Sequence, residues 1–372
     1  MRAMQPFDFQ PSTRVIFGEN TLVQLGALTK ELGGTRVLVV SDSGVVSAGI
    51  VENALKSLRK ESLAVSVFDG VEENPTTRHV ESGVRFAAAQ GKINLIIGLG
   101  GGSAMDCAKG INFLLTNGGA MADYWGEGKA SKPMLPSIGV PTTAGTGSEA
   151  QSFALITHEV SRQKMACGDK KARFRTVILD PVLTATVPNH VAAAAGIDAI
   201  AHAVESYVST KRNPISQAFA REAWRLLEGS FETVLRNPEN IDAQGRMLLG
   251  AHLAGAAIEN SMLGAAHACA NPLTSRYGVV HGVAVGLMLP HVVEFNELAV
   301  GALYRELYPS ALNERIVELK TAARLAERLR DFNIDNADLP KLAKEAAAQW
   351  TGEFNPRRVG EVELLELYEA AY

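Results

Sequence analysis

The sequence has 372 residues, a net charge of −4 and a hydrophobic fraction of 47%, the values of an ordinary globular protein with room for two domains. Its lysines and arginines are dispersed, which argues against a nucleic-acid surface. The amino-terminal segment is too short and too polar for a signal peptide. We expect no apolar run to be long enough to span a bilayer. Three well-separated cysteines (Cys107, Cys167 and Cys269) are expected to be buried, reduced thiols, which favours a cytoplasmic protein.

Strands and helices are predicted to alternate through the first half of the chain. Short apolar runs, typical of parallel strands buried on both faces, are predicted as strands at 13–18, 36–42, 63–68 and 94–98. The segments between and after them are predicted as helices at 50–60, 76–90 and 103–116. This alternation predicts a Rossmann-like, doubly wound α/β domain.

A glycine-rich turn, Gly98 to Ser103, lies between the predicted strand at 94–98 and the helix that follows. Backbone N–H groups approach a diphosphate closely where side chains are absent, and a helix amino end favours negative charge. The pattern is not the dinucleotide fingerprint, because Ser103 replaces its last glycine. Taken alone, the turn fits a structural role about as well.

Two further features favour nucleotide binding. The loop from Pro141 to Glu149, rich in threonine and glycine, follows a strand-like run at 135–140. Asp42 ends the second predicted strand, where a carboxylate can accept bonds from ribose hydroxyls and repel a 2′-phosphate, which favours NAD over NADP. The alternative for Asp42 is a cap of the following turn.

The second half of the chain carries a candidate metal site. The run 192–208 reads as a buried helix in which Asp198 and His202, four residues apart, share one face. A hydrogen-bonded Asp–His pair inside a core would explain these two alone. His267 and His281 also lie among small or apolar residues, and one aspartate with three histidines is a typical set for a first-row transition metal. We interpret the set as a catalytic metal site.

Taken in order, these motifs resemble the iron-containing (group III) alcohol dehydrogenases. The resemblance rests on Gly100-Gly101-Gly102-Ser103-x-x-Asp106-x-x-Lys109, the 142–149 loop, Gly196-Ile197-Asp198-Ala199-x-x-His202-Ala203-x-Glu205, and the segment from His267 to Gly282. It covers nearly the whole chain, through Leu289-Pro290-His291 to Asn355-Pro356-Arg357.

The resemblance implies a dehydroquinate synthase-like fold, with an α/β dinucleotide-binding domain at 1–184 and an all-helical, metal-binding catalytic domain at 185–372. It implies four metal ligands: Asp198, His202, His267 and His281. It also implies a set of nucleotide contacts: Asp42, Asn74, Pro75, Thr76, Gly101, Gly102, Ser103, Asp106, Thr142, Thr143, Thr146 and Lys164. A homodimer or a higher homo-oligomer is expected from the same resemblance.

Asn271 departs from the pattern of the family. Members often carry a histidine four residues after the third ligand, implicated in handling the substrate-side proton. Asparagine can donate and accept hydrogen bonds but does not titrate near neutral pH, so neither the proton route nor the substrate choice of the family carries over to this chain by analogy. We expect Asn271 to be a possible substrate contact and no other protein group to be catalytic beyond the metal site.

The expected activity is reversible hydride transfer between a small alcohol and NAD, giving an aldehyde or ketone. A divalent metal on the oxygen stabilises the alkoxide. Four protein ligands fill a tetrahedral zinc site, whereas Fe²⁺ accepts five or six, so iron is favoured with zinc possible. The alternatives are a related reductase, such as a glycerol-type, lactaldehyde or maleylacetate reductase, and a catalytically silent nucleotide- or metal-binding protein.

Overall fold

The computed structural model describes residues 6–11 and 13–372, which form two compact units. The sheet unit holds 11–143 and 148–187, and the helical unit holds 6–10, 144–147 and 188–372, within the described residues. The segments 6–10 and 144–147 therefore belong to the helical unit, although they precede the break predicted after residue 184.

A six-stranded parallel sheet forms the centre of the sheet unit, in the order β1-β9-β6-β4-β2-β3. Its strands are β1 (Arg14–Phe17), β2 (Arg36–Asp42), β3 (Ala64–Val71), β4 (Leu95–Gly100), β6 (Ser137–Pro141) and β9 (Thr176–Leu179). After β3 the chain crosses β2 to form β4, and later strands add on the opposite side. The direction of winding thus reverses between β2 and β4, and ligands of open α/β sheets bind at the carboxyl end of such a switch point.

Helices cover both faces of this sheet, and alternate strand residues point to each side. Leu38, Val40 and Ile96 pack with α4 (Thr77–Ala89) and α5 (Gly102–Asn117). Their sequence neighbours pack with α1 (Leu25–Glu31) and α3 (Ile50–Lys60) on the other face. The short helices α2 (Ser43–Ser47) and α6 (Pro181–Thr184) follow β2 and β9. The continuous apolar runs of the sequence therefore reflect burial on two faces.

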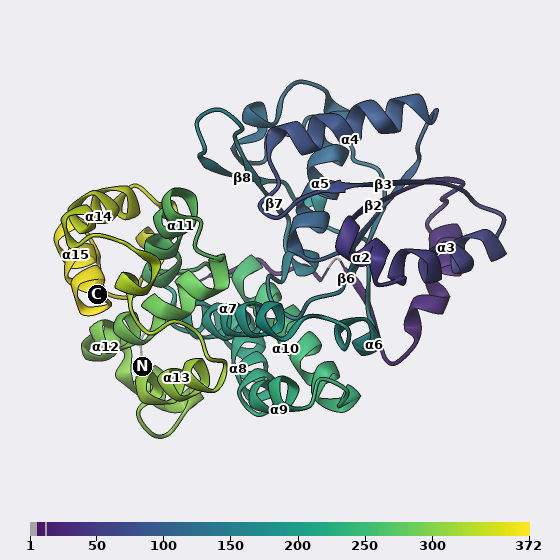
Figure 1. Ribbon diagram of the computed structural model, residues 1–372. Coiled ribbons are helices and arrows are strands. Elements are labelled where there is room, and N and C mark those ends of the chain that lie inside the picture. Colours follow the sequence, from purple (N-terminus) through teal and green to yellow (C-terminus); the bar gives the residue numbers. More distant parts are fainter. Residues whose placement is uncertain (1–5, 12) are drawn as a thin grey trace. The chain divides into compact units, whose positions relative to one another are not determined.

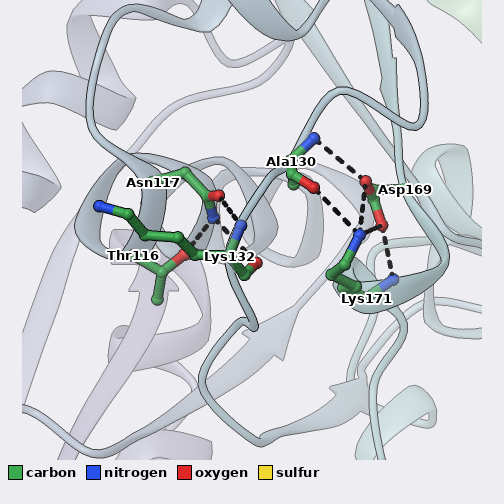
Figure 2. A network of polar contacts seen from close by, with 6 residues as sticks. All are labelled: Thr116, Asn117, Ala130, Lys132, Asp169 and Lys171. Carbon is green, nitrogen blue, oxygen red and sulfur yellow. Dashed lines mark hydrogen bonds and ion pairs between the residues drawn. The ribbon is translucent and has the colours of Figure 1, made fainter.

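A small second sheet completes the unit, in the order β5-β8-β7, and was not expected from the sequence. Its strands are β5 (Gly126–Glu127), β7 (Phe153–Thr157) and β8 (Lys164–Gly168). Side chains fix the connection between α5 and β6 against this sheet (Figure 2). Buried Asp169 accepts from the Ala130 N–H (3.2 Å), and the Asn117 side chain accepts from the Lys132 N–H (2.7 Å).

The helical unit contains no strand among its described residues. Its α-helices are α7 (Asn189–Val208), α8 (Pro214–Glu228), α9 (Phe231–Arg236), α10 (Ile241–Glu259), α11 (Ala265–Tyr277), α12 (His281–Leu307), α13 (Leu312–Ala322), α14 (Leu339–Ala347) and α15 (Glu361–Ala370). Helix α7 packs against α8, α10 and α12, so it is buried along most of its length (Figure 1). The predicted fold class, an α/β domain followed by a helical one, is confirmed.

Helix α12 is long and apolar enough, by length and composition alone, to cross a membrane, so the expectation that no run reaches this length is wrong. However, 61% of its apolar window is buried inside the structure, a property it shares with core helices of soluble proteins. The three cysteines are buried and unpaired, as expected.

Candidate active site

Four of the predicted site residues come from three helices of the helical unit. Asp198 and His202 lie one turn apart on α7, His267 lies in the first turn of α11, and His281 is the first residue of α12. The exposed fraction of Asp198, His202 and His267 is 4%, 4% and 3%. A carboxylate and imidazoles removed from water to this degree require partners.

Asp198, His267 and His281 converge. One ligand atom from each lies within 4.8 Å of the other two, as a shared metal ion requires. Asp198 Oδ1 lies 3.4 Å from His267 Nε2, and the His267 and His281 ring centroids are 5.5 Å apart. His202 lies beside this group, with its Nε2 3.6 Å from Asp198 Oδ1 and its ring stacked on His267 at 4.9 Å, but it falls outside the compact set of three.

Unsatisfied polar atoms show that these residues fit a metal ion. Asp198 Oδ1 and His267 Nε2 are buried, make no hydrogen bond and lie 3.4 Å apart. Buried polar atoms are rarely left in this state, and each exception needs an explanation. A carboxylate oxygen and an imidazole nitrogen that face a common point would be satisfied together by one divalent cation.

The electrostatics of the group favour a cation. Burial alone would raise the pKa of Asp198, but the imidazoles of His202, His281 and His267 outweigh it and hold this pKa well below its usual range. Burial lowers the pKa of His267, whereas the carboxylates of Glu205 and Asp198 raise it to about 9. Burial is the larger effect at His202, whose pKa is lowered in spite of Asp198. Positive charge is thus stabilised between the two carboxylates.

Glycines bring the helices close enough for this convergence. A Cβ atom on Gly282 would lie 1.9 Å from the Ala194 carbonyl oxygen and 3.2 Å from Asp198 Cβ. A Cβ on Gly286, one turn later, would meet Ile197 at 2.9 Å. The start of α12 therefore lies directly on the backbone of α7, which places His281 beside Asp198.

In the sheet unit, the predicted nucleotide residues gather at the switch point between β2 and β4. Asp42 Oδ1 accepts from the Val45 N–H at 3.0 Å, and a Cβ on Gly100 would lie 3.1 Å from Asp42 Oδ2. One oxygen of Asp42 therefore caps α2 and the other faces the glycine turn, while the contact of Asp42 with a ribose stays a prediction. Gly101 and Gly102 start α5, and the Thr142 N–H donates to the Gly100 carbonyl at 2.9 Å. Thr143 lies against Gly101, 3.5 Å from the position of a Cβ there.

Three more of these residues meet along the small sheet. Thr76 forms an isolated bridge with Thr157, whose N–H donates to the Pro75 carbonyl at 2.8 Å, and Thr157 pairs with Lys164 in the ladder of β7 and β8. Asn74 has a left-handed backbone, with φ of 54°. Lys164 is thus held near the 74–76 turn. Thr146, by contrast, is grouped with the helical unit.

Asp106 lies in a buried network that the sequence did not reveal. The Ser148 hydroxyl donates to Asp106 Oδ1 at 2.5 Å, and Lys109 Nζ lies 3.7 Å from the same oxygen. Lys109 also donates to the Ser148 and Phe153 carbonyls at 2.6 and 2.7 Å. Burial raises the pKa of Asp106, although Lys109 and the Ser148 hydrogen bond oppose the rise. The lysine thereby ties the 148–153 segment to α5.

Sequence reasoning assigned no role to Glu205 or to His79. Glu205 contacts His267 through its carboxylate. The sequence signal that could have indicated this is spacing: Asp198, His202 and Glu205 lie at i, i+4 and i+7, on one face of α7. His79 is buried, and its Nδ1 accepts from the Thr76 N–H at 3.0 Å, so it caps α4. Asn271, in α11, donates to Gln349 Oε1 at 3.0 Å.

The family model of iron-containing alcohol dehydrogenase matches residues 12–181, and that of the Fe-containing alcohol dehydrogenase family, C-terminal, matches 192–372. The chain belongs to the iron-containing alcohol dehydrogenase family. This alcohol dehydrogenase is 34% identical over 367 residues to alcohol dehydrogenase 4 of Schizosaccharomyces pombe, across 96% of this chain and 87% of that one.

Solved structures agree with this membership. A crystal structure of 1,3-propanediol oxidoreductase matches at a TM-score of 0.95 with 32% identity, covering 99% of this chain and 100% of the other. The structure of sulfoacetaldehyde reductase from Bifidobacterium kashiwanohense in complex with NAD+ matches at 0.90 with 26% identity, covering 99% of each. The predicted family, fold and enzyme class, an NAD-dependent metal-containing alcohol dehydrogenase, are confirmed at the level of the family.

Proposed function

We propose that this alcohol dehydrogenase transfers a hydride reversibly between a small alcohol and NAD, with iron held by Asp198, His202, His267 and His281. The observation that carries the proposal is the convergence of buried Asp198 and His267 with partly buried His281, where Asp198 Oδ1 and His267 Nε2 make no hydrogen bond. When bound, Fe²⁺ supplies a Lewis acid that stabilises an alkoxide and polarises a carbonyl. Its higher coordination number favours it over Zn²⁺, which four protein ligands would saturate.

The sheet unit is proposed as the NAD-binding domain and the helical unit as the metal-binding domain, with the boundary after residue 184. NAD contacts are assigned to Asp42, Asn74, Pro75, Thr76, Gly101, Gly102, Ser103, Asp106, Thr142, Thr143, Thr146 and Lys164. The support is the position of Asp42 beside Gly100 at the switch point, where a ribose and a diphosphate would be adjacent. The NAD+ complex of the similar reductase agrees with this choice of cofactor.

The experiment is NADH formation with a panel of small alcohols, using protein reconstituted with Fe²⁺, alongside His267→Ala. We expect this variant to lose metal and activity while its circular dichroism stays native, because the substitution removes one imidazole and leaves the backbone of α11 intact. His190→Ala is the matched control, since His190 is exposed on α7. Unchanged turnover in His267→Ala would refute the metal site, and absence of NADH with every alcohol would favour a silent binding protein.

We further propose that the enzyme is cytoplasmic and forms a homodimer or a higher homo-oligomer. Three buried free thiols suit a reducing compartment. The edge strand β1 has one neighbour in its sheet and carries exposed Val15 and Phe17, an apolar edge that a second copy would cover. Sedimentation of the purified protein tests the oligomer, and a purely monomeric species at micromolar concentration would contradict it.

A further inference from the structure

The amino end of helix α11 is contacted by a carboxylate from α7. The Ala266 N–H donates to Glu205 Oε1 at 2.7 Å, and His267 Nδ1 lies 2.5 Å from Glu205 Oε2. Glu205 is 96% shielded from water, since its exposed fraction is 4%. One buried carboxylate thus contacts both the backbone that precedes His267 and the imidazole itself.

The surroundings of α11 hold this arrangement in place. The residue before the helix, Gly264, supplies no side-chain cap, and the Ala265 N–H donates instead to Asn355 Oδ1 at 3.3 Å. Asn355 is in turn bonded to Asn296, which donates to Asn355 Oδ1 at 3.0 Å and accepts from Asn355 Nδ2 at 2.8 Å. The first two N–H groups of α11 are therefore satisfied by side chains from distant helices and loops, and a negative charge at this end is favoured by the helix dipole.

Geometry dictates what the carboxylate does to the ring. An ionised carboxylate only accepts hydrogen bonds, so the nitrogen facing Glu205 must carry the proton. In the neutral imidazole the other nitrogen, Nε2, is then the one with a free lone pair, and it is Nε2 that lies 3.4 Å from Asp198 Oδ1 among the converging atoms. A fixed tautomer with its lone pair directed at the metal position is what a ligating histidine needs.

We propose that Glu205 is a positioning residue that fixes the orientation and tautomer of His267 for metal binding. The inference rests on the metal site proposed above. It predicts that the carboxylate, and not an isosteric amide, is required. A glutamine side chain has one acceptor, its amide oxygen, and one donor, its amide nitrogen. If the oxygen accepts from the Ala266 N–H, the nitrogen donates to His267 Nδ1 and selects the wrong tautomer. If the oxygen instead accepts from His267 Nδ1, the Ala266 N–H faces another donor.

The test is Co²⁺ binding alone, followed by visible absorption and by competition with a chelator, in wild-type protein, Glu205→Gln and Glu205→Asp. We expect affinity for Co²⁺ to fall about 10- to 100-fold in Glu205→Gln. Glu205→Asp keeps the charge on a shorter side chain, so its affinity for Co²⁺ should lie between those of wild type and Glu205→Gln. This variant also provides the test if Glu205→Gln fails to fold. Wild-type affinity in either folded variant would overturn the proposal.

Asp180→Asn is the matched control for loss of a buried carboxylate. Asp180 is 1% exposed and accepts from the Asn20 and Leu22 N–H groups, both at 3.0 Å, in the sheet unit. This variant should lose stability and keep its Co²⁺ affinity. If wild-type protein binds no Co²⁺, or binds it as tightly as His267→Ala does, the proposed metal site is wrong. If His267→Ala abolishes Co²⁺ binding but Glu205→Gln binds Co²⁺ as tightly as wild type, only the proposed role of Glu205 is wrong.

Discussion

At the scale of single residues, Asp42 has an observed capping role on one oxygen and a proposed recognition role on the other. Oδ1 caps the short helix α2 through the Val45 N–H, whereas Oδ2 is directed at Gly100. A negative charge fixed beside the glycine turn would repel a 2′-phosphate on a ribose bound there. We therefore expect the cap to add a modest amount to stability and the charge to favour NAD+ over NADP+.

Replacing Asp42 separates these roles. Asp42→Gly should lower the preference for NAD+ over NADP+ by about tenfold, equivalent to ~1.4 kcal/mol of lost repulsion. Glycine is a tolerated cap, so stability should change by only a few tenths of a kcal/mol. Asp42→Asn keeps an acceptor for Val45 without the charge and should behave alike. The measurement is kcat/KM for both cofactors; an unaltered ratio in both variants would leave Asp42 as a capping residue alone.

Asn271 changes the proton chemistry expected of the family pattern. Its amide donates to Gln349, so it holds a neighbouring side chain and takes up no proton near neutral pH. Asn271→His would introduce a group with an ordinary pKa near 6.5. We expect the pH dependence of kcat to gain a transition in that region, with activity higher above it, where the neutral ring accepts a proton. Asn271→Gln, which keeps the amide, should retain the original profile; identical profiles for all three proteins would remove this position from the proton route.

At the scale of elements, the close approach of α12 to α7 creates the candidate metal site. The spacing of Asp198 and His202 on one helix could be read from the sequence, and so could the separate histidines. Their convergence could not, because it depends on which helices touch. The glycines that permit contact, Gly282 and Gly286, look in a sequence like ordinary helix-weakening residues.

Gly282→Ala tests this dependence. Its Cβ would lie 1.9 Å from a backbone oxygen of α7, so the helices must separate. Overpacking of this kind costs about 1–3 kcal/mol, and here it also withdraws His281 from Asp198. We expect a lower thermal midpoint together with weakened Co²⁺ binding. Gly278→Ala is a useful comparison, because its Cβ would meet nothing within 4 Å while its φ of 66° brings backbone strain alone. Co²⁺ affinity equal to wild type in Gly282→Ala would mean that helix contact does not set the site.

At the scale of the whole molecule, the alternation of strands and helices was enough to predict an α/β unit, and the family resemblance predicted the helical unit that follows it. Three features were not predictable. The sheet of β5, β8 and β7 is made of short strands, two to five residues long, that carry little periodicity. The segment 144–147 leaves the sheet unit through tertiary contacts, with a Cβ on Gly145 meeting Ala195 at 2.6 Å. Glu205 contacts His267 across 62 residues of sequence.

The proposed assignment of NAD to the sheet unit and of metal to the helical unit predicts separate ligand footprints. A ligand that binds the native state slows hydrogen exchange by up to about 100-fold at 100 times its dissociation constant, ~2.7 kcal/mol, in the segments whose opening it opposes. Co²⁺ alone should protect α7 around Asp198, the start of α11 and the start of α12. NAD+ alone should protect the segments after β2, β4 and β6. Mass spectrometry of peptides from each segment measures both, with His267→Ala as the control for the metal footprint. Protection by Co²⁺ that survives in this variant, or that falls mainly on the sheet unit, would contradict the assignment of metal to the helical unit.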